Sequence, residues 1–194
     1  MTILDTIKKE TKSHHQQVET VLVSELKSLK TKDDYAGLLA RLYSFYKPIE
    51  DEVHRTIDAE IITDISKREH TSRIVEDLQL LEHREETPLP EPQLTMKSLS
   101  YALGVLYVME GSTMGGQIIS KMIHKNVDMN GADAVNYFSS YGDDTHKMWA
   151  KFKIQVIKIE STLNHKEVIS GAEDTFNQLR QWLLATKPLE STSV

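Results

Sequence analysis

The stretch YALGVLYVMEGSTMGGQIIS, from Tyr101 to Ser120, decides the fold of this 194-residue chain. Its first nine residues, Tyr101–Met109, carry no charge. A helix that is apolar on all sides is a buried helix, so we expect this segment at the centre of a helical protein. It continues into GSTMGG, where three glycines each destabilise a helix by roughly 1 kcal/mol relative to alanine. Bare backbone must therefore serve a purpose here, such as a closely packed helix, a kink or a flat ligand.

Composition limits the classes of protein that the chain can belong to. The hydrophobic content of 39% and charged content of 27% are typical of one soluble globular domain. A net charge of -6 argues against a nucleic-acid binder, and the absence of cysteine excludes disulfides, thiol nucleophiles and cysteine-ligated metals. The N-terminus lacks a signal-peptide pattern, and no apolar run approaches the roughly 20 residues of a membrane span. We expect a soluble, cytoplasmic protein.

Hydrophobic periodicity predicts an all-α chain of about six helices. Threonine and aspartate three residues apart, at Thr2 and Thr31, indicate two helix starts, and Pro48 is a possible break. The proline-rich segment 85–93 and the polar segment 126–144 are expected to connect helices, with one short turn at 132–138. The expected helices are 3–26, 34–57, 66–83, 95–125, 144–163 and 166–185. Together they form one domain, 1–186, followed by a polar tail, 187–194.

The first predicted helix carries a group of polar residues along one edge. Helical spacing places His15 on the same edge as Lys8, Lys12 and Glu19. A carboxylate one turn from an imidazole is the usual partner of a metal-ligating histidine, and two lysines suit an anionic ligand. The alternative is an ordinary solvent-exposed helix edge with a Glu–His pair.

The glycines of the central stretch also share faces. Gly104, Gly111 and Gly115 fall on one face of a helix, and Ser112 and Gly116 on the adjacent one. A planar ligand carrying iron could lie between this bare backbone and the edge with the histidine. Close packing between two helices at small residues is the alternative.

Other site chemistries have little support in the sequence. There is no HExxH zinc motif, and the single Asp51-x-x-His54 has no second copy to complete a di-iron site. The histidines outside the first helix stand among polar or charged residues, so we expect them on the surface: His54, His70, His83, His124, His146 and His165.

Two motifs resemble those of the haem oxygenase family. The string TKSHHQQVE, Thr11–Glu19, is similar to the family's proximal-histidine motif. The string LYVMEGSTMGGQ, Leu106–Gln117, resembles its distal motif, especially that of the bacterial, biliverdin-producing branch. Their order and separation match the family, and the resemblance spans essentially the whole chain. It implies a single-domain, haem oxygenase-like helical bundle.

The resemblance also implies roles for individual residues. His15 is the expected axial ligand of the haem iron, which the motif register selects over His14, and Glu19 is the carboxylate that orients it. Gly111 and Gly115 are the distal glycines over the haem. Ser112 occupies the catalytic position that holds an aspartate in the animal enzymes. The remaining haem-binding positions are Gly116 beside the distal glycines, Lys8, Lys12 and Lys153 at the propionates, and Phe176 as an aromatic of the cavity wall.

The activity that the resemblance implies uses haem as both substrate and cofactor. Oxygen and electrons from an external donor open the ring to biliverdin, with release of CO and ferrous iron, and the lysines set which ring edge is attacked. The expected partners are an electron donor such as a ferredoxin, a flavodoxin or a reductase, and a bilin-accepting protein. The alternative function is haem binding or storage without turnover on the same scaffold.

Overall fold

The computed structural model describes residues 1–83, 92 and 94–187, and every regular element in this part of the chain is a helix. The all-α prediction is therefore confirmed, since the described residues contain only one isolated bridge, between Thr31 and Asp128, outside the helices. None of the helices searched combines the length and apolarity needed to cross a membrane. The elements are α1 (Ile3–Glu10), α2 (Lys12–Ser28), α3 (Lys32–Thr56), η1 (Ile65–Lys67), α4 (Thr71–Leu80), α5 (Leu99–Ser112), η2 (Thr113–Gly115), α6 (Gly116–Asn126), α7 (Asn136–Ser139), η3 (Gly142–Asp144), α8 (Thr145–Lys158), η4 (Glu160–Thr162) and α9 (His165–Ala185).

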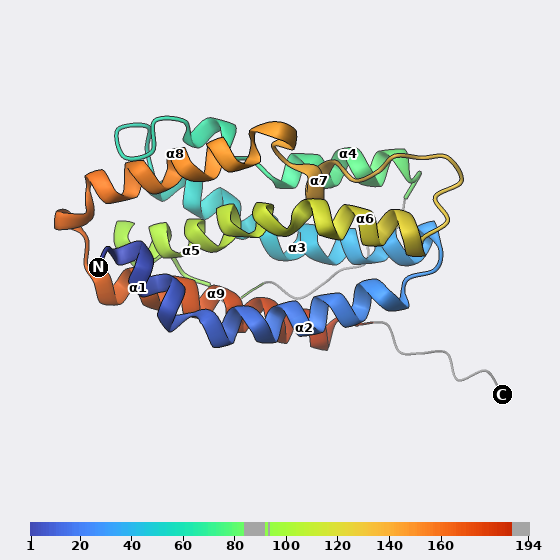
Figure 1. Ribbon diagram of the computed structural model, residues 1–194, viewed down its shortest axis with the longest axis horizontal. Helices are drawn as coiled ribbons and strands as arrows, with labels where there is room; N and C mark the ends of the chain where they lie inside the picture. The colour runs from blue at the N-terminus through green and yellow to red at the C-terminus, as the bar shows by residue number, and fades with distance from the viewer. Residues whose placement is uncertain (84–91, 93, 188–194) are drawn as a thin grey trace.

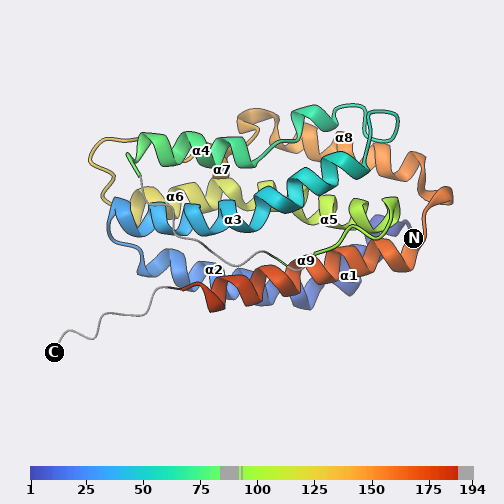
Figure 2. The same ribbon diagram turned by 180° about the vertical axis from the view of Figure 1, so that it is seen from behind.

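The long helices lie side by side along the longest axis of the molecule (Figures 1 and 2). In both views α5 and α6 form a middle layer with α3, flanked by α1, α2 and α9 on one side and by α4, α7 and α8 on the other. Within α5 every residue from Ser100 to Glu110 except Tyr107 is buried. This confirms that the uncharged stretch is the central helix of the fold.

The first glycine of the central stretch is a packing residue. A Cβ atom at Gly104 would stand 2.0 Å from the backbone oxygen of Val168 in α9. On the opposite helix, a Cβ at Gly171 would stand 2.2 Å from the oxygen of Tyr101. Helices α5 and α9 therefore pack backbone against backbone, which only glycine at these positions permits.

Three of the predicted helices differ in detail from the structure. The expected helix 3–26 is interrupted at Thr11, where the backbone leaves helical geometry (φ -89°, ψ 2°) and the carbonyl of Ile7 accepts hydrogen bonds from both the N–H and the hydroxyl of Thr11. The possible break at Pro48 does not occur, because α3 runs through this residue to Thr56, close to the predicted end at 57. The predicted helix 95–125 begins at Leu99, with Ser98 as its N-cap, and contains the 3-10 turn η2 at the glycine motif.

The remaining boundaries follow the predicted pattern closely. Segment 66–83 divides into η1 and α4, and the short turn expected at 132–138 is the helix α7. The predicted connector 85–93 lies, apart from Pro92, outside the described residues, as does the tail 187–194 apart from Lys187. The domain boundaries therefore stay predictions.

Candidate functional site

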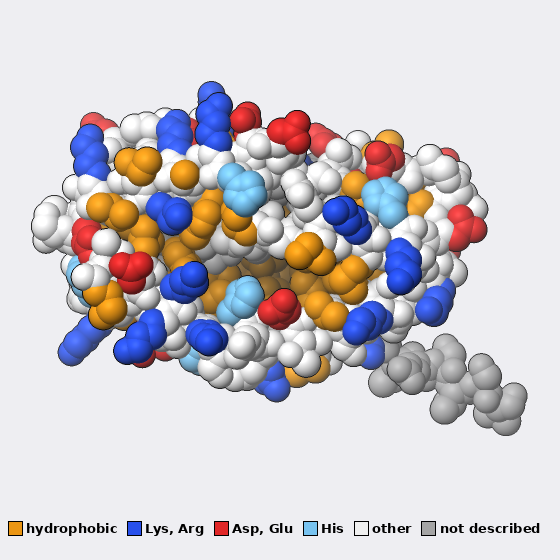
Figure 3. Space-filling view, viewed as in Figure 1, with side chains coloured by type: hydrophobic (Ala, Val, Ile, Leu, Met, Phe, Trp, Pro, Cys, Tyr) orange, Lys and Arg blue, Asp and Glu red, His pale blue; other side chains and the backbone are white. Residues whose placement is uncertain are grey.

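A cavity of about 690 Å³ separates α2 from the α5–η2–α6 segment. This volume is within the range of small-molecule and cofactor sites. Figure 3 shows it as a hollow with a largely apolar interior and with lysine or arginine side chains around its rim. All of the site residues predicted from the sequence line it: Lys8, Lys12, His15, Glu19, Gly111, Ser112, Gly115, Gly116, Lys153 and Phe176.

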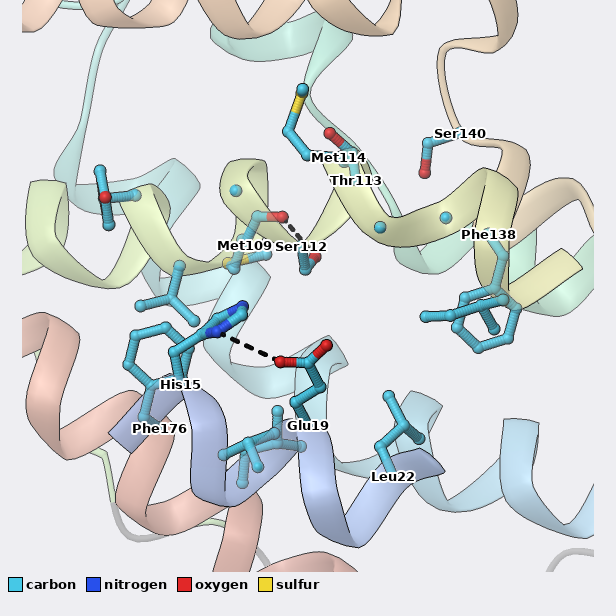
Figure 4. Close-up of a pocket in the computed structure, with 18 of the residues that line it drawn as sticks. His15, Glu19, Leu22, Met109, Ser112, Thr113, Met114, Phe138, Ser140 and Phe176 are labelled. Carbon is cyan, nitrogen blue, oxygen red and sulfur yellow. Dashed lines mark hydrogen bonds and ion pairs between the residues drawn. The ribbon is translucent and has the colours of Figure 1, made fainter. Parts of the chain in front are cut away.

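One wall of the cavity carries an imidazole beside a carboxylate. His15 and Glu19 rise from successive turns of α2 into the gap, as Figure 4 shows, and each side chain is 62% exposed. His15 Nδ1 lies 3.8 Å from a carboxylate oxygen of Glu19, which is longer than a hydrogen bond but close enough for electrostatic attraction. The ring of Phe176 in α9 meets the imidazole edge-on at 5.7 Å between centroids.

The two adjacent histidines of α2 have different surroundings. Because Nδ1 of His15 faces Glu19, the ring nitrogen left for a ligand is Nε2, and no hydrogen bond to the described residues engages it. His14 is half-buried and does not line the cavity, and its Nδ1 atom is buried without a hydrogen-bond partner. The geometry therefore favours His15 as the ligating residue.

The opposite wall is backbone. A Cβ atom at Gly115 would have no atom within 4 Å, and one at Gly111 would have only the ring of Trp149, at 3.8 Å. Both glycines line the cavity, so bare backbone at these positions leaves room for a ligand. Gly116 differs, because its Cβ would stand 1.7 Å from the oxygen of Phe138 in α7. The glycine-rich motif thus combines two residues that open the cavity with one that packs a helix.

Ser112 on this wall uses its hydroxyl hydrogen within its own helix. The hydroxyl of Ser112 donates a 2.6 Å hydrogen bond to the carbonyl of Met109. Its oxygen therefore offers only lone pairs to the cavity. Figure 4 shows Ser112 and Met109 across the gap from His15 and Glu19.

Three lysines from three helices border the cavity: Lys8 in α1, Lys12 in α2 and Lys153 in α8. None of them forms an ion pair with another described residue. Lys153 is half-buried, and its ammonium group lies 5.6 Å from the centroid of the Trp149 ring. The three cations are available to an anionic group of a ligand.

The prediction that His70 lies on the surface is wrong. Its side chain is 5% exposed and lines the cavity, and its Nε2 lies 2.9 Å from a carboxylate oxygen of Glu110. The other oxygen of that carboxylate pairs with Arg68, and both side chains are fully buried. Glu110, a carboxylate inside an otherwise apolar helix, was the signal in the sequence that a buried partner exists.

The same network extends in two directions. Tyr141 donates a 2.9 Å hydrogen bond to Glu110, and burial together with the negative charge of Glu110 raises the pKa of its hydroxyl far above the ordinary value. Arg68 also contacts both carboxylate oxygens of Asp64, at 3.2 and 3.0 Å. Burial alone would raise the pKa of Asp64, but hydrogen bonds from Gln155, Arg68 and Lys151 outweigh it and lower the pKa to about 2.

The other histidines outside α2 are less buried than His70. His124, His146 and His165 are exposed, which confirms the prediction for them, whereas His54 and His83 are half-buried.

Comparison with known proteins places the chain among relatives. The profile of the family described as heme oxygenase matches residues 1–185. A heme oxygenase of Xanthomonas campestris pv. campestris is 26% identical over 154 residues, which cover 79% of this chain and 90% of that protein. The heme oxygenase PigA of Pseudomonas aeruginosa is 26% identical over 183 residues, which cover 91% of this chain and 88% of that protein.

The fold has a solved counterpart as well. A crystal structure of the NO- and CO-bound heme oxygenase from Neisseria meningitidis superposes with a TM-score of 0.81 at 20% identity, covering 100% of this chain and 96% of that one. A profile that spans nearly the whole chain, together with a cavity between an imidazole and a glycine wall, leads to one conclusion. The chain belongs to the haem oxygenase family.

Proposed function

We propose that this protein is a haem oxygenase that cleaves haem to biliverdin with release of CO and ferrous iron. Oxygen is the co-substrate, and the electrons come from an external donor such as a ferredoxin, a flavodoxin or a reductase. A bilin-accepting protein is a further expected partner. The cytoplasmic location predicted from the sequence also remains a prediction.

One observation carries the proposal: an imidazole–carboxylate pair on α2 faces bare glycine backbone across a cavity of about 690 Å³. A haem fits this arrangement because the open space at Gly115 accepts a flat ring and the walls are mostly apolar. His15 Nε2 would ligate the iron as a neutral imidazole. Glu19 would orient the ring from Nδ1. Lys8, Lys12 and Lys153 would pair with the propionates.

The bound group supplies the redox chemistry and the oxygen-binding site, and the chain's own residues supply position and environment. Gly111 and Gly115 let the backbone approach the ring plane closely. The Ser112 hydroxyl donates its hydrogen bond to the Met109 carbonyl, so it would offer only oxygen lone pairs to a bound haem. Lysines paired with the propionates would fix the rotation of the ring about its normal, and so which edge of the ring would react.

The decisive experiment is spectroscopic. Addition of hemin to the purified protein is expected to give a sharp Soret band at one equivalent. Ascorbate in air is then expected to replace that band with the absorption of a bilin. A stable Soret band without bilin formation would indicate haem storage instead of turnover. Absence of a stoichiometric Soret band would contradict the proposal altogether.

The ligand assignment has its own matched pair of variants on adjacent residues. His15→Ala is expected to broaden and shift the Soret band and to abolish bilin formation, because the iron loses its protein ligand. His14→Ala is the control and is expected to keep the spectrum of the unsubstituted protein. If His15→Ala bound hemin with an unchanged spectrum, His15 would not be the ligand.

A further inference from the structure

One aromatic side chain of the cavity wall has no part in the proposed function. Trp149 of α8 is half-buried and lines the cavity. A Cβ atom at Gly111 would stand 3.8 Å from Cη2 of the Trp149 indole, so the ring lies beside the glycine wall, Gly111 and Gly115. The indole therefore borders the space that a ligand at Gly111 would occupy.

The indole ring is held in place by two other aromatic rings. It stacks on Phe152, at 5.6 Å between centroids and 21° between planes, and Phe152 is fully buried. Tyr107 of α5 meets it at 5.4 Å between centroids and an angle of 57°. Aromatic pairs at such distances stabilise each other beyond the area that they bury. The orientation of the Trp149 ring is therefore set by the packing of α5 against α8.

The same ring contacts one of the three lysines that border the cavity. The ammonium group of Lys153 lies over the Trp149 ring, 5.6 Å from its centroid, which is within the range of a cation–π interaction. The two residues stand four positions apart in α8 and so share a face of the helix. Lys8 and Lys12 are exposed, and in the described part of the chain neither has such a contact with an aromatic ring. Of the three cations, Lys153 is therefore the one that a neighbouring side chain positions.

Trp149 adjoins both features that would decide how a bound ring is oriented. The glycine wall would determine where backbone approaches the ring, and a lysine paired with a carboxylate would determine its rotation. The edge of the indole lies beside Gly111, and its face lies under the Lys153 ammonium group. One rigid side chain thus relates the position of the cation to the position of the glycine wall.

We infer that Trp149 is a positioning residue for the substrate. Its indole ring holds the ammonium group of Lys153 at the edge of the cavity, in a defined position relative to the glycine wall. It thereby restricts the rotation at which a planar ring with carboxylate side chains binds. The inference rests on the proposed function, because the ring that carries these carboxylates is haem.

The contact between the two side chains can be tested in the ligand-free protein. Protons above the face of an indole are shielded, so the ε-methylene signal of Lys153 is expected upfield of those of Lys8 and Lys12 in a carbon–proton correlation spectrum. Its loss in Lys153→Ala assigns the signal. In Trp149→Leu the signal is expected to join those of the other lysines, whereas Trp149→Phe should retain part of the shift. A Lys153 signal that does not move in Trp149→Leu would overturn the inference.

Two ligands separate positioning from packing: hemin and hemin dimethyl ester, in which both carboxylates are esterified. Trp149→Leu is expected to weaken hemin binding by about two- to fivefold, because a cation–π interaction no longer pre-organises the ammonium group for a carboxylate. Binding of the dimethyl ester is expected to change much less. Equal losses for the two ligands would mean that the indole acts by packing against the ring, and the inference would be wrong.

The bilin product reports the rotation of the ring. Trp149→Leu and Lys153→Ala are each expected to change the ratio of bilin isomers in the same direction, by about two- to fivefold. The double variant should go no further than Lys153→Ala, since the indole acts through that lysine. Lys147→Ala is the control, because Lys147 is an exposed lysine of the same helix that does not line the cavity, and it should leave the ratio unchanged.

The remaining outcomes are equally decisive. Additive effects of Trp149→Leu and Lys153→Ala on the isomer ratio would contradict the inference, as would a comparable effect of Lys147→Ala. Should Trp149→Leu not fold, a Lys153 signal no further upfield than those of Lys8 and Lys12 in the unsubstituted protein would still refute it. Absence of any bilin would refute the proposed function, whereas bilin formation with an unchanged isomer ratio in Trp149→Leu would refute this inference alone.

Discussion

At the scale of single residues, the glycines of the central segment divide into two kinds. Gly104 and Gly116 lie against the backbone of another helix, although Gly116 also lines the cavity, whereas a Cβ atom at Gly111 or Gly115 would meet no backbone and would enter the cavity. The sequence places Gly104, Gly111 and Gly115 on one helical face but cannot say what stands opposite each of them. That depends on α9 and α7, which come much later in the chain.

Gly115→Leu is expected to impair haem binding more than folding. Its side chain would enter open space, and leucine favours helical backbone by up to about 1 kcal/mol over glycine. The melting temperature should therefore stay near that of the unsubstituted protein, while the hemin titration loses its sharp end point. Both quantities can be measured on one preparation, by thermal unfolding and by absorption.

Gly104→Ala is the matched control for that substitution. Its Cβ would collide with the Val168 oxygen, so α5 and α9 must separate, at a cost of about 2 kcal/mol or more. The folded fraction should still bind hemin with a normal spectrum. A heavy loss of stability in Gly115→Leu with a normal hemin spectrum would mean that Gly115 also serves packing.

His70 illustrates where sequence reasoning fails at this scale. It directly follows two charged residues, Arg68 and Glu69, and such a setting is typical of a surface segment. Arg68, however, is fully buried because Glu110 and Asp64 neutralise it inside the protein. The local sequence shows only that the neighbours of His70 are polar. The burial of Arg68 depends on Glu110, which lies 42 positions away in the sequence.

Asp64 gives this buried network a pH dependence that can be measured. Its carboxyl has an ordinary pKa of 3.8 and a pKa of about 2 in the folded protein. A lowered pKa stabilises the fold at every pH above the ordinary value, and this stabilisation disappears as the pH falls from about 4 to 2. The contribution of the ionised carboxylate at neutral pH is about 2 kcal/mol.

Asp64→Asn is therefore expected to be less stable than the unsubstituted protein by about 2 kcal/mol at pH 7, and the two stability curves should converge toward pH 2. Denaturant unfolding at a series of pH values measures both. A stability difference that stays constant between pH 5 and pH 2 would show that the substitution acts through packing and not through the charge of the carboxylate.

At the scale of elements, the two walls of the cavity are anchored very differently. Helix α5 is buried from Ser100 to Glu110 except at one residue, but α2 buries only Val18, Glu25 and Leu26 of its 17 residues. Periodicity predicted both helices, because apolar spacing is a local property. It could not predict that α2 lies largely exposed along a cavity, because that depends on which other helices pack against α2.

This contrast predicts uneven local stability. Backbone amides of α2 between Lys12 and Val23 are expected to exchange with solvent much faster than those of α5 in the ligand-free protein, because few buried contacts hold them. Hemin should slow exchange in α2 more than in α5, since a ligand stabilises the state that binds it. Hydrogen–deuterium exchange with mass spectrometry resolves the two helices. Equal protection in the ligand-free protein would contradict the expectation.

At the scale of the whole molecule, the sequence predicts the fold class and the residues that border the cavity, and the structure adds how they meet. Charge is one example. Although the net charge of the chain is -6, three lysines without an ion pair to the described residues border the same cavity: Lys8, Lys12 and Lys153. These residues come from α1, α2 and α8, so their grouping is a property of the fold that no count of charges along the chain contains.

The glycine wall has a consequence for how such a protein can change. A surface made of peptide backbone has no side chain for a substitution to shorten, so at Gly111 and Gly115 point mutations can only add atoms. Variation that alters how a ligand sits without closing the site must therefore arise at the bordering side chains, such as Met109, Met114 and Phe176. The glycine backbone at the centre of the site therefore allows little variation, and new ligand specificity can arise only at the side chains that border it.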